Sequence, residues 1–241
     1  TSYSSGSTGV NRIRIEDCTI IGGYYNVTFR GSSSTDTVDE IEVINNELLE
    51  GYYGGIYSYY TYAPLYKSNL INLRTEGSTN SRGIYLYYTY GPFEFSHNRV
   101  HNPGQYGMYI YNANNVETES SLIYNNSIGG GFTNTSTSAS GFYISSSSNI
   151  GVYFNSINND SQTGRGIYTL SSASDISVMN NSFAFTGSGN GYAAYHADPS
   201  SLVAHDYNLY YSGTSSSFVY YGSDLTDLTA LQNINQPEDN D

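Results

Sequence analysis

The feature that most constrains the fold of this chain is an internal repeat of about 27 residues. Its marker is an Asn followed two positions later by an apolar residue, and successive copies lie 23 to 29 residues apart. The marker residues are Asn46, Asn69, Asn98, Asn126, Asn155, Asn181 and Asn208, and Cys18 occupies the same place one repeat earlier. Self-similarity at a period of this size is the sequence signature of a solenoid, a propeller or another repeat array.

A second marker, Gly-apolar-Tyr, interleaves with the first. Its copies begin at Gly55, Gly83, Gly107, Gly141 and Gly166, and Gly191-Tyr192-Ala193 reads as a degenerate sixth copy. Around both markers apolar residues recur at every second position, as at Ile41 and Val43 or at Ile84 and Leu86. This is the period of a β-strand. With a third short strand after each Asn, every repeat is predicted to hold three short strands joined by turns.

Three strands in about 27 residues fit one coil of a parallel β-helix, in which equivalent strands stack about 4.8 Å apart. A propeller blade needs about 40 residues, and an antiparallel sandwich has no such super-period. Parallel crossovers favour a right-handed coil. We therefore predict an all-β fold, a right-handed parallel β-helix of about eight coils over residues 10–222. Residues 1–9 are predicted to form a flexible lead, and 223–241 a C-terminal cap with an acidic tail or linker.

The Asn marker has two physical explanations. Asn tolerates the left-handed backbone conformation that a tight bend between strands requires. Its side-chain amide both donates and accepts, so stacked Asn residues can hydrogen-bond from coil to coil in a buried ladder. Cys18 replaces Asn in the first repeat, where such a ladder would end.

Composition excludes several classes of protein. The chain has a single Lys and a formal net charge of −13, which argues against a helical bundle and against a double-stranded nucleic-acid binder. No apolar run reaches the length of a membrane span, and the lone Cys excludes a disulfide scaffold. Ser, Tyr, Asn and Gly make up nearly half of the 241 residues. The acidic, hydroxyl-rich composition suggests an exported protein, at the cell surface or outside the cell.

The alternating apolar residues, then Asn-Asn-x-Ile, then Gly-Ile-Tyr, resemble the repeat of right-handed parallel β-helix proteins over about residues 10–235. The run that starts at Asp206 and the Leu-Thr-Asp-Leu-Thr-Ala-Leu-Gln run from Leu225 are similar to the last coil of large secreted bacterial members. In those proteins a short helix closes the barrel, so the resemblance implies a helical cap here. It implies little about function, because the fold carries pectate and alginate lyases, polygalacturonases, phage tailspikes, adhesins and passive stalks.

Residues that could support catalysis are few. Lys67 lies two positions before Asn69, so it is expected to point outward, next to Ile44 and Ser96 of the adjacent coils. Glu42 and Glu94 fall in one outward column two coils apart, where an inverting glycosidase would need its two carboxylates. Arg14 lies in that same column and is expected to pair with Glu42 as a surface ion pair. We therefore assign no catalytic residue.

The histidines and the acidic tail predict no metal site. His97 and His101 flank Asn98 across a turn, and His205 falls on an inward position, as a core histidine would. The tail from Glu238 to Asp241 lacks the ligand spacing of a calcium loop. No cofactor and no metal are expected.

The most distinctive predicted surface is aromatic. One outward column holds Tyr57, Tyr85, Tyr109, Tyr143 and Tyr168, and a second column beside it holds Tyr59, Tyr87 and Tyr111. These tyrosines could contact a glycan or a partner rod, or they could simply stabilise an exposed sheet, because tyrosine is a strong β-former. Three longer segments, 32–39, 74–82 and 129–140, are expected to protrude as loops.

Three functions are compatible with these observations. The first is a non-catalytic β-helix segment of a larger secreted or surface bacterial protein, acting as an adhesin, a stalk or a glycan-contacting rod. The second is a polysaccharide lyase or glycoside hydrolase of the β-helix type, and the third is a phage tail-fibre segment. The expected partners are an extracellular polysaccharide or another protein rod, with no nucleic acid and no membrane span. The oligomeric state stays open.

Overall fold

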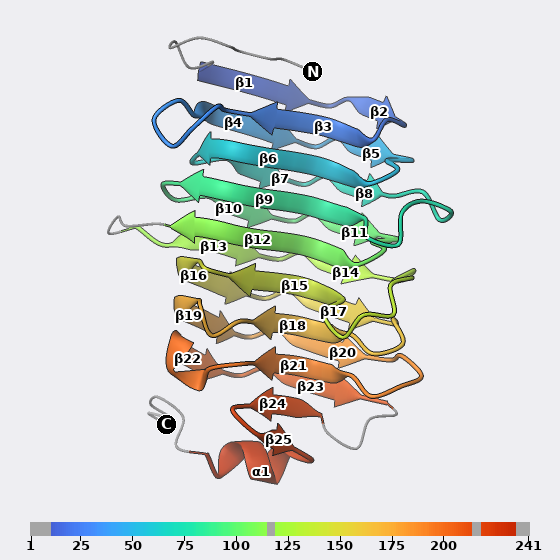
Figure 1. The fold of residues 1–241 in the computed structure, drawn as a ribbon, viewed down its shortest axis with the longest axis vertical. Coiled ribbons are helices and arrows are strands. Elements are labelled where there is room, and N and C mark those ends of the chain that lie inside the picture. The colour runs from blue at the N-terminus through green and yellow to red at the C-terminus, as the bar shows by residue number, and fades with distance from the viewer. Residues whose placement is uncertain (1–10, 115–118, 214–217, 235–241) are drawn as a thin grey trace.

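The computed structural model describes residues 11–114, 119–213 and 218–234. The chain winds into a rod of stacked coils, with the strand Asn11–Glu16 at one end and a short helix at the other (Figure 1). Each coil contributes one strand to each of three parallel stacks, and eight strands occupy each stack. The chain makes about seven turns from the first coil to the last, so the predicted all-β parallel β-helix and its short C-terminal helix are confirmed.

The three stacks follow one another along every coil. The first holds β1 (Asn11–Glu16), β4 (Val38–Ile44), β7 (Leu65–Lys67), β10 (Glu94–Ser96), β13 (Ser121–Tyr124), β16 (Ser148–Tyr153), β19 (Ser174–Met179) and β22 (Leu202–Asp206). The second holds β2 (Thr19–Ile21), β5 (Glu47–Leu49), β8 (Leu70–Asn72), β11 (Arg99–His101), β14 (Ser127–Gly129), β17 (Ser156–Asn159), β20 (Ser182–Phe185) and β23 (Leu209–Ser212). The third holds β3 (Tyr25–Arg30), β6 (Gly54–Tyr62), β9 (Arg82–Tyr90), β12 (Tyr106–Asn114), β15 (Ser140–Ser145), β18 (Arg165–Thr169), β21 (Tyr192–His196) and β24 (Val219–Tyr221).

The C-terminal end is closed by elements that leave the coil pattern. A 3₁₀ turn, η1 (Pro199–Ser201), precedes β22. After β24 the chain reverses into β25 (Asp224–Leu225), which pairs with β24 antiparallel, and ends in α1 (Leu228–Gln232). Leu225 and Leu231 are buried against the last coil. The predicted lead at 1–9 and the tail at 235–241 lie outside the described residues.

The core runs along the axis of the rod. Alternate side chains of every strand point inward, and Ile41, Val43, Ile84 and Leu86 have no exposed surface. The period-two pattern therefore correctly predicted which face of each strand is buried. Within each stack, identical or similar side chains lie on top of one another in successive coils. Tyr66 and Phe95, for example, stack with ring centroids 5.0 Å apart.

The predicted asparagine ladder is formed. The side chains of Asn46, Asn69, Asn98, Asn126, Asn155 and Asn181 are buried. In the middle of the ladder, the Asn126 amide nitrogen donates to the Asn155 side-chain oxygen at 3.0 Å and to the Phe95 carbonyl of the preceding coil at 2.9 Å. Its own side-chain oxygen accepts from the backbone and side-chain nitrogens of Asn98. Every amide hydrogen and lone-pair site is thus used, which makes a buried polar column tolerable.

The two ends of the ladder differ. At the first coil, the Cys18 backbone nitrogen donates to the Asn46 side-chain oxygen at 3.0 Å, so Cys18 stands in the ladder position as predicted. Its thiol is exposed. At the last coil, the Asn208 amide nitrogen donates to the Val178 carbonyl and interacts with the Tyr210 hydroxyl. The last amide of the ladder thus has a hydroxyl partner within its own coil.

The prediction that the ladder Asn adopts the left-handed conformation is wrong. The residue before each ladder position has the positive φ, from 52° to 58° in the eight coils: Asp17, Asn45, Ser68, His97, Asn125, Phe154, Asn180 and Tyr207. The bend places this residue outside the coil, and it leaves the following Asn with its side chain inside. Three of the eight are Asn, which visits this region at low cost, whereas Phe154 is a bulky residue there.

The Gly-apolar-Tyr marker has a packing explanation. A Cβ atom on Gly107 would lie 2.4 Å from Ile128 Cγ2 and 2.6 Å from the Gly141 carbonyl oxygen. The equivalent atom on Gly83 would lie 2.4 Å from Val100 Cγ1. Glycine is required because the third-stack strand starts in contact with the apolar side chain of the second stack.

The proposed sixth copy of this marker is out of register by two residues. Gly166, Ile167 and Tyr168 align with Ala193, Ala194 and Tyr195, because Ile167 pairs with Ala194 and Tyr168 with Tyr195. The segment Gly191-Tyr192-Ala193 was misaligned because it also contains a Gly and a Tyr. The true copy, Ala193-Ala194-Tyr195, has Ala in place of Gly. The aromatic column consequently extends further than the sequence markers indicated.

The first prediction concerns the ladder. Asn126→Ala should lower the free energy of unfolding by about 1–3 kcal/mol, because it removes the oxygen that accepts from the buried backbone and side-chain nitrogens of Asn98 and the amide that donates to the Phe95 carbonyl. Urea denaturation measures the change. Ser127→Ala, at the neighbouring exposed position, is the control and should change the free energy by less than about 0.5 kcal/mol. Equal effects for the two variants would show that the ladder contributes nothing specific.

The second prediction concerns the bend. Phe154 is 60% exposed and has φ of 55°. Phe154→Asn should raise the free energy of unfolding by about 1 kcal/mol, because Asn tolerates this conformation better. Tyr153→Asn, one residue earlier in β16, is the control and should be destabilising, since Asn is disfavoured within a strand. Destabilisation by Phe154→Asn in urea denaturation would mean that contacts of the Phe ring outweigh the backbone strain.

Candidate functional site

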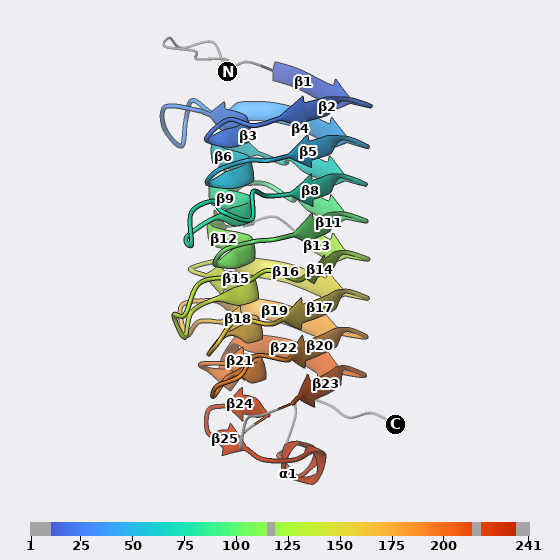
Figure 2. The same cartoon turned by 90° about the vertical axis from the view of Figure 1, so that its right-hand side faces the viewer.

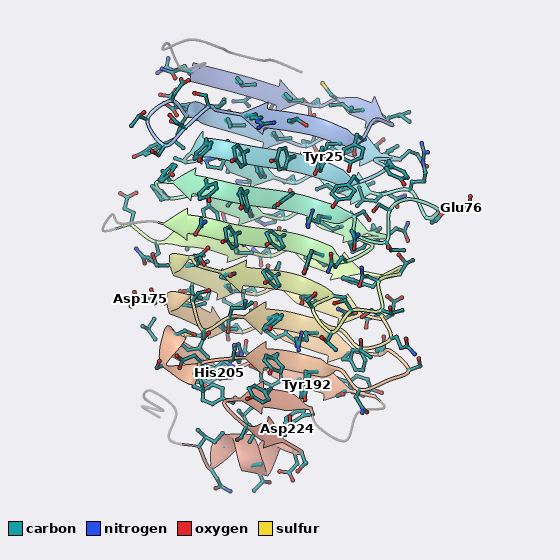
Figure 3. All side chains as sticks on the ribbon, viewed as in Figure 1. Tyr25, Glu76, Asp175, Tyr192, His205 and Asp224 are labelled. Carbon is teal, nitrogen blue, oxygen red and sulfur yellow. The ribbon has the colours of Figure 1, made fainter. Side chains whose placement is uncertain are left out.

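The candidate site is the outer face of the third stack, which we call the tyrosine face. It lies toward the viewer in Figure 1, over β6, β9, β12, β15, β18, β21 and β24. Figure 3 shows aromatic side chains distributed along it. Strand pairing places Tyr57, Tyr85, Tyr109, Tyr143, Tyr168, Tyr195 and Tyr220 in one column over seven consecutive strands. The second column holds Tyr59, Tyr87 and Tyr111, preceded by Arg30 and followed by Ser145.

The rings of the face contact one another along the rod. Tyr109 and Tyr143 stack with centroids 4.7 Å apart and planes within 5°, and Tyr195 stacks on Tyr220 at 4.1 Å. The contact between Tyr85 and Tyr109 is edge-to-face at 5.0 Å. Such pairs each contribute about 0.5–1.5 kcal/mol beyond the area that they bury. Part of this face therefore stabilises the rod whatever else it does.

The tyrosines are half-buried, so the expectation of fully outward rings needs a correction. All eight predicted face tyrosines have intermediate exposure, because each ring is covered by its neighbours in adjacent coils. Burial raises the pKa of Tyr57 and of Tyr143 to about 12. It also raises the pKa of Tyr85 and Tyr109. The phenols are consequently uncharged at neutral pH and can both donate and accept hydrogen bonds.

Two arginines are inserted among these rings. The Arg82 guanidinium lies 4.2 Å from the Tyr85 ring centroid and 5.0 Å from that of Tyr109. Arg165 is sandwiched between Tyr168 and Tyr195, 4.1 Å from each centroid, and only 7% of its surface is exposed. Burial lowers the pKa of Arg165, and the nearby tyrosines oppose that effect. An arginine keeps its charge in proteins, so both remain cations.

Neither arginine has a carboxylate partner among the described residues, where the ion pairs involve Arg12, Arg14 and Arg74 instead. The Nε atoms of Arg82 and Arg165 are buried without a hydrogen-bond acceptor. Because the rings cover the flat faces of a stacked guanidinium, its in-plane N–H donors are the groups left to bind an anion. The two arginines stand in one structural column three coils apart, or about 14 Å at the usual strand spacing.

Loops form a rim beside the arginine column. The segments 73–81 and 130–139 project from the edge of the face in both views (Figures 1 and 2). The Asn134 amide nitrogen donates to the Thr79 carbonyl and to the Asn80 side chain, both at 2.9 Å. The Tyr106 hydroxyl donates to Ser138 Oγ at 3.2 Å. These bonds tie the loops to one another and to the face. The third segment, 32–39, projects from the opposite edge.

The residues weighed for catalysis lie on a different surface, the outer face of the first stack. Lys67 pairs with Ile44 and Ser96 in the adjacent coils, as predicted. Leu65 separates Glu42 from Glu94, and Arg14 Nη1 donates to Glu42 Oε2 at 2.8 Å.

Glu94 on that surface is held by two hydroxyl groups. It accepts hydrogen bonds from the Tyr124 hydroxyl and from Ser96 Oγ, both at 2.7 Å. Burial tends to raise the pKa of Glu94, but these hydrogen bonds outweigh it and the pKa is lowered. The group is therefore an ionised acceptor at neutral pH. It does not have the properties of a general acid, which needs a raised pKa.

The histidines do not gather with other metal ligands. His97 occupies the left-handed bend position, and His101 is exposed on β11. His205 is buried, as predicted. In the described part of the chain, no three residues among His, Cys, Asp and Glu lie close enough to hold a metal ion. No helix of the described ranges could cross a membrane.

Sequence reasoning missed four residues of the face: Tyr195, Tyr220, Arg82 and Arg165. The spacing of 27 residues between Tyr168 and Tyr195 equals the mean repeat and could have revealed the first of them. Arg82 and Arg165 both stand directly before a Gly-Ile-Tyr triplet. That shared position was visible in the sequence, but only the structure shows that the guanidinium of each arginine lies over tyrosine rings of its own coil and of the next.

The comparisons with known proteins concern the fold. A family model described as "Right handed beta helix region" matches residues 2–128 and 82–235. No curated protein and no solved structure matches the chain. Together the two matched segments span nearly the whole sequence and agree with the stacked parallel coils. The chain therefore belongs to the right-handed β-helix family.

Proposed function

We propose that this chain is a non-catalytic contact rod of a larger secreted or cell-surface protein, and that the tyrosine face binds an extracellular polysaccharide. The observation that carries the proposal is the continuous column of seven tyrosines with two arginines among its rings, neither of which forms an ion pair with a carboxylate of the described residues. Aromatic patches of this extent often mark contact sites. A second protein rod is the other partner that a flat face of this kind could accept.

The chemistry of the face favours a polymer with both hydroxyl and acidic groups. Half-buried phenols offer ring edges and neutral hydroxyls, which suit the hydroxyls of a sugar. Arg82 and Arg165 are cations without carboxylate partners on a chain of net charge −13. They add the donors that carboxylates bind best. The polymer would lie along the rod axis, where equivalent side chains recur at every coil.

The proposal assigns no reaction to the face. A β-helix lyase or glycoside hydrolase needs a base and paired carboxylates that converge on one substrate. In the structure, Lys67 and Glu94 belong to the first stack, whereas the arginines belong to the third. No observation favours a tail-fibre role over a contact rod. The adhesin and stalk roles differ from each other only in whether the face is occupied, which the following experiments decide.

The third prediction tests the aromatic contact. Replacing Tyr85 and Tyr109 together by Ser should weaken binding to a responsive polysaccharide in a glycan array by about tenfold or more, because it removes two adjacent rings from the centre of the face. The control is Tyr153→Ser with Tyr211→Ser, which removes two rings from other surfaces. Circular dichroism should show both variants folded. If binding is unchanged by the face variant, or falls equally in both, the tyrosines are only a stabilising surface.

The fourth prediction tests the charge of the ligand. Arg82→Gln with Arg165→Gln should weaken binding of a carboxylated polysaccharide at least tenfold and leave binding of its neutral, carboxyl-reduced form unchanged, since charge-assisted hydrogen bonds contribute about 1.5–3 kcal/mol each. Arg12→Gln, at an exposed residue paired with Glu40 on the first stack, is the control for net charge. Equal losses for both polymers would assign the arginines a purely structural role.

A further inference from the structure

The C-terminal end of the rod contains a pair of buried histidines that the proposed function does not use. His196 on β21 is fully buried, and His205 on β22 is 5% exposed. Their rings contact each other edge-to-face with centroids 4.9 Å apart. His196 ends the seventh coil and His205 lies at the start of the eighth, next to the elements that close the barrel. Figure 3 labels His205 at this end of the molecule.

Both positions belong to columns that are mostly aliphatic in the middle coils. The His196 column holds Leu86, Ile110 and Ile144 before it becomes polar at Thr169. The His205 column holds Ile123, Val152 and Val178. Nearer the N-terminal end, the same two columns hold Ser58 and Tyr66, whose hydroxyls are hydrogen-bonded to each other. The imidazoles therefore stand at positions that aliphatic side chains fill in the middle of the rod.

The neighbours of His196 can satisfy only one of its two ring nitrogens. Nδ1 and Thr169 Oγ1 lie 2.8 Å apart, whereas Nε2 is buried without a hydrogen-bond partner. His196 forms no ion pair with any carboxylate of the described residues. Burial, together with the neighbouring His205, lowers the pKa of His196 well below its ordinary value. A positive charge is thus poorly tolerated here while the coil is closed.

The second histidine is part of the network that ends the asparagine ladder. The Tyr210 hydroxyl is hydrogen-bonded to His205 Nε2 and also to the Asn208 amide. The Tyr221 ring lies against both histidines, with centroids 5.9 Å from His196 and 5.4 Å from His205. The network therefore joins the ladder, the last coil and β24 in one cluster.

Other titratable groups near this cluster come from every adjoining element. The negative charge of Asp206 on β22 helps to raise the pKa of Tyr210, and its carboxylate accepts a hydrogen bond from the Tyr207 backbone nitrogen. Asp224 on β25 accepts from the Tyr192 hydroxyl at 2.8 Å, and Asp227 caps α1 through the Ala230 nitrogen. From α1 itself, Leu228, Leu231 and Gln232 line a groove of about 300 Å³ beside His205, and none of them is charged.

We propose that the His196–His205 pair is an acid-sensitive latch, which keeps the C-terminal cap closed at neutral pH and releases β24, β25 and α1 when His196 gains a proton. A solenoid opens most cheaply at its end, because a terminal coil has a neighbour on one side only. Opening gives His196 access to water and leaves the coils above in place. It also exposes the strand edges of the last coil.

The direction of the pH dependence follows from linkage. The closed cap binds fewer protons than the open cap, in which His196 returns to an ordinary pKa near 6.5. Closure is therefore most favourable above about pH 6.5 and weakens as the pH falls below it. The population ratio of open to closed caps should rise by up to about tenfold per pH unit for the one proton taken up.

The test is hydrogen–deuterium exchange measured by mass spectrometry at pH 7.5, 6.5 and 5.5, with each rate divided by the intrinsic exchange rate at that pH. Protection of peptides covering 219–234 should fall about fivefold between pH 6.5 and 5.5, and about tenfold between pH 7.5 and 5.5. Peptides from β9 and β12, in the middle of the rod, should keep their protection and serve as the internal control.

His196→Leu, which restores the residue type of Leu86 in the same column, should abolish the pH dependence while the cap stays protected. If that variant does not fold, His196→Thr, which copies Thr169, is measured in its place. His205→Val should leave a pH response, because His196 is retained. The proposal is overturned if wild-type cap protection is equal at pH 6.5 and 5.5. It is also overturned if the His196 variant keeps the full response, which would assign the effect to the aspartates.

Discussion

The asparagine ladder is the interaction on which the rest of the structure depends. It sets the vertical register of the coils, because each Asn side chain joins the coil above it to the coil below. Once that register is fixed, equivalent residues of every repeat lie above one another. The stacked core, the glycine contacts and the tyrosine columns all follow from this superposition. A single repeat could form none of these features, since each exists only between coils.

Superposition also explains why a surface can be built here from so simple a repeat. A residue placed once per repeat becomes a continuous column, and a tyrosine in that position yields seven rings along one face. The rings stabilise one another, as the stacked pair Tyr109 and Tyr143 shows. Stability alone does not account for Arg82 and Arg165, because a buried cation without a carboxylate partner costs free energy. Their presence is the reason to regard the face as a binding surface.

Features that are set by residues within one repeat could be predicted from the sequence better than contacts between residues of two coils. The strand faces, the ladder positions and the first five tyrosines could be predicted from the period within a repeat and from the spacing of its markers. The left-handed conformation was assigned to the ladder Asn instead of to the residue before it. In two coils that preceding residue is Phe154 or Tyr207, and bulky aromatic residues are uncommon in this conformation. The last copy of the glycine marker was misaligned, since Ala193 takes the place of glycine there. The arginines were missed because their contacts join rings of two coils, Tyr85 with Tyr109 and Tyr168 with Tyr195, and the period within one repeat does not reveal such contacts.

The most direct test of the central claim is hydroxyl-radical footprinting of the intact protein with and without a carboxylated polysaccharide, because it locates the contact without substituting any residue. The account predicts that protection by the polymer is confined to tyrosines of β9, β12, β15, β18 and β21. The outer faces of the first and second stacks should react equally in both samples. An unchanged footprint on the tyrosine face at saturating polymer, or protection centred on the first stack near Lys67 and Glu94, would contradict it.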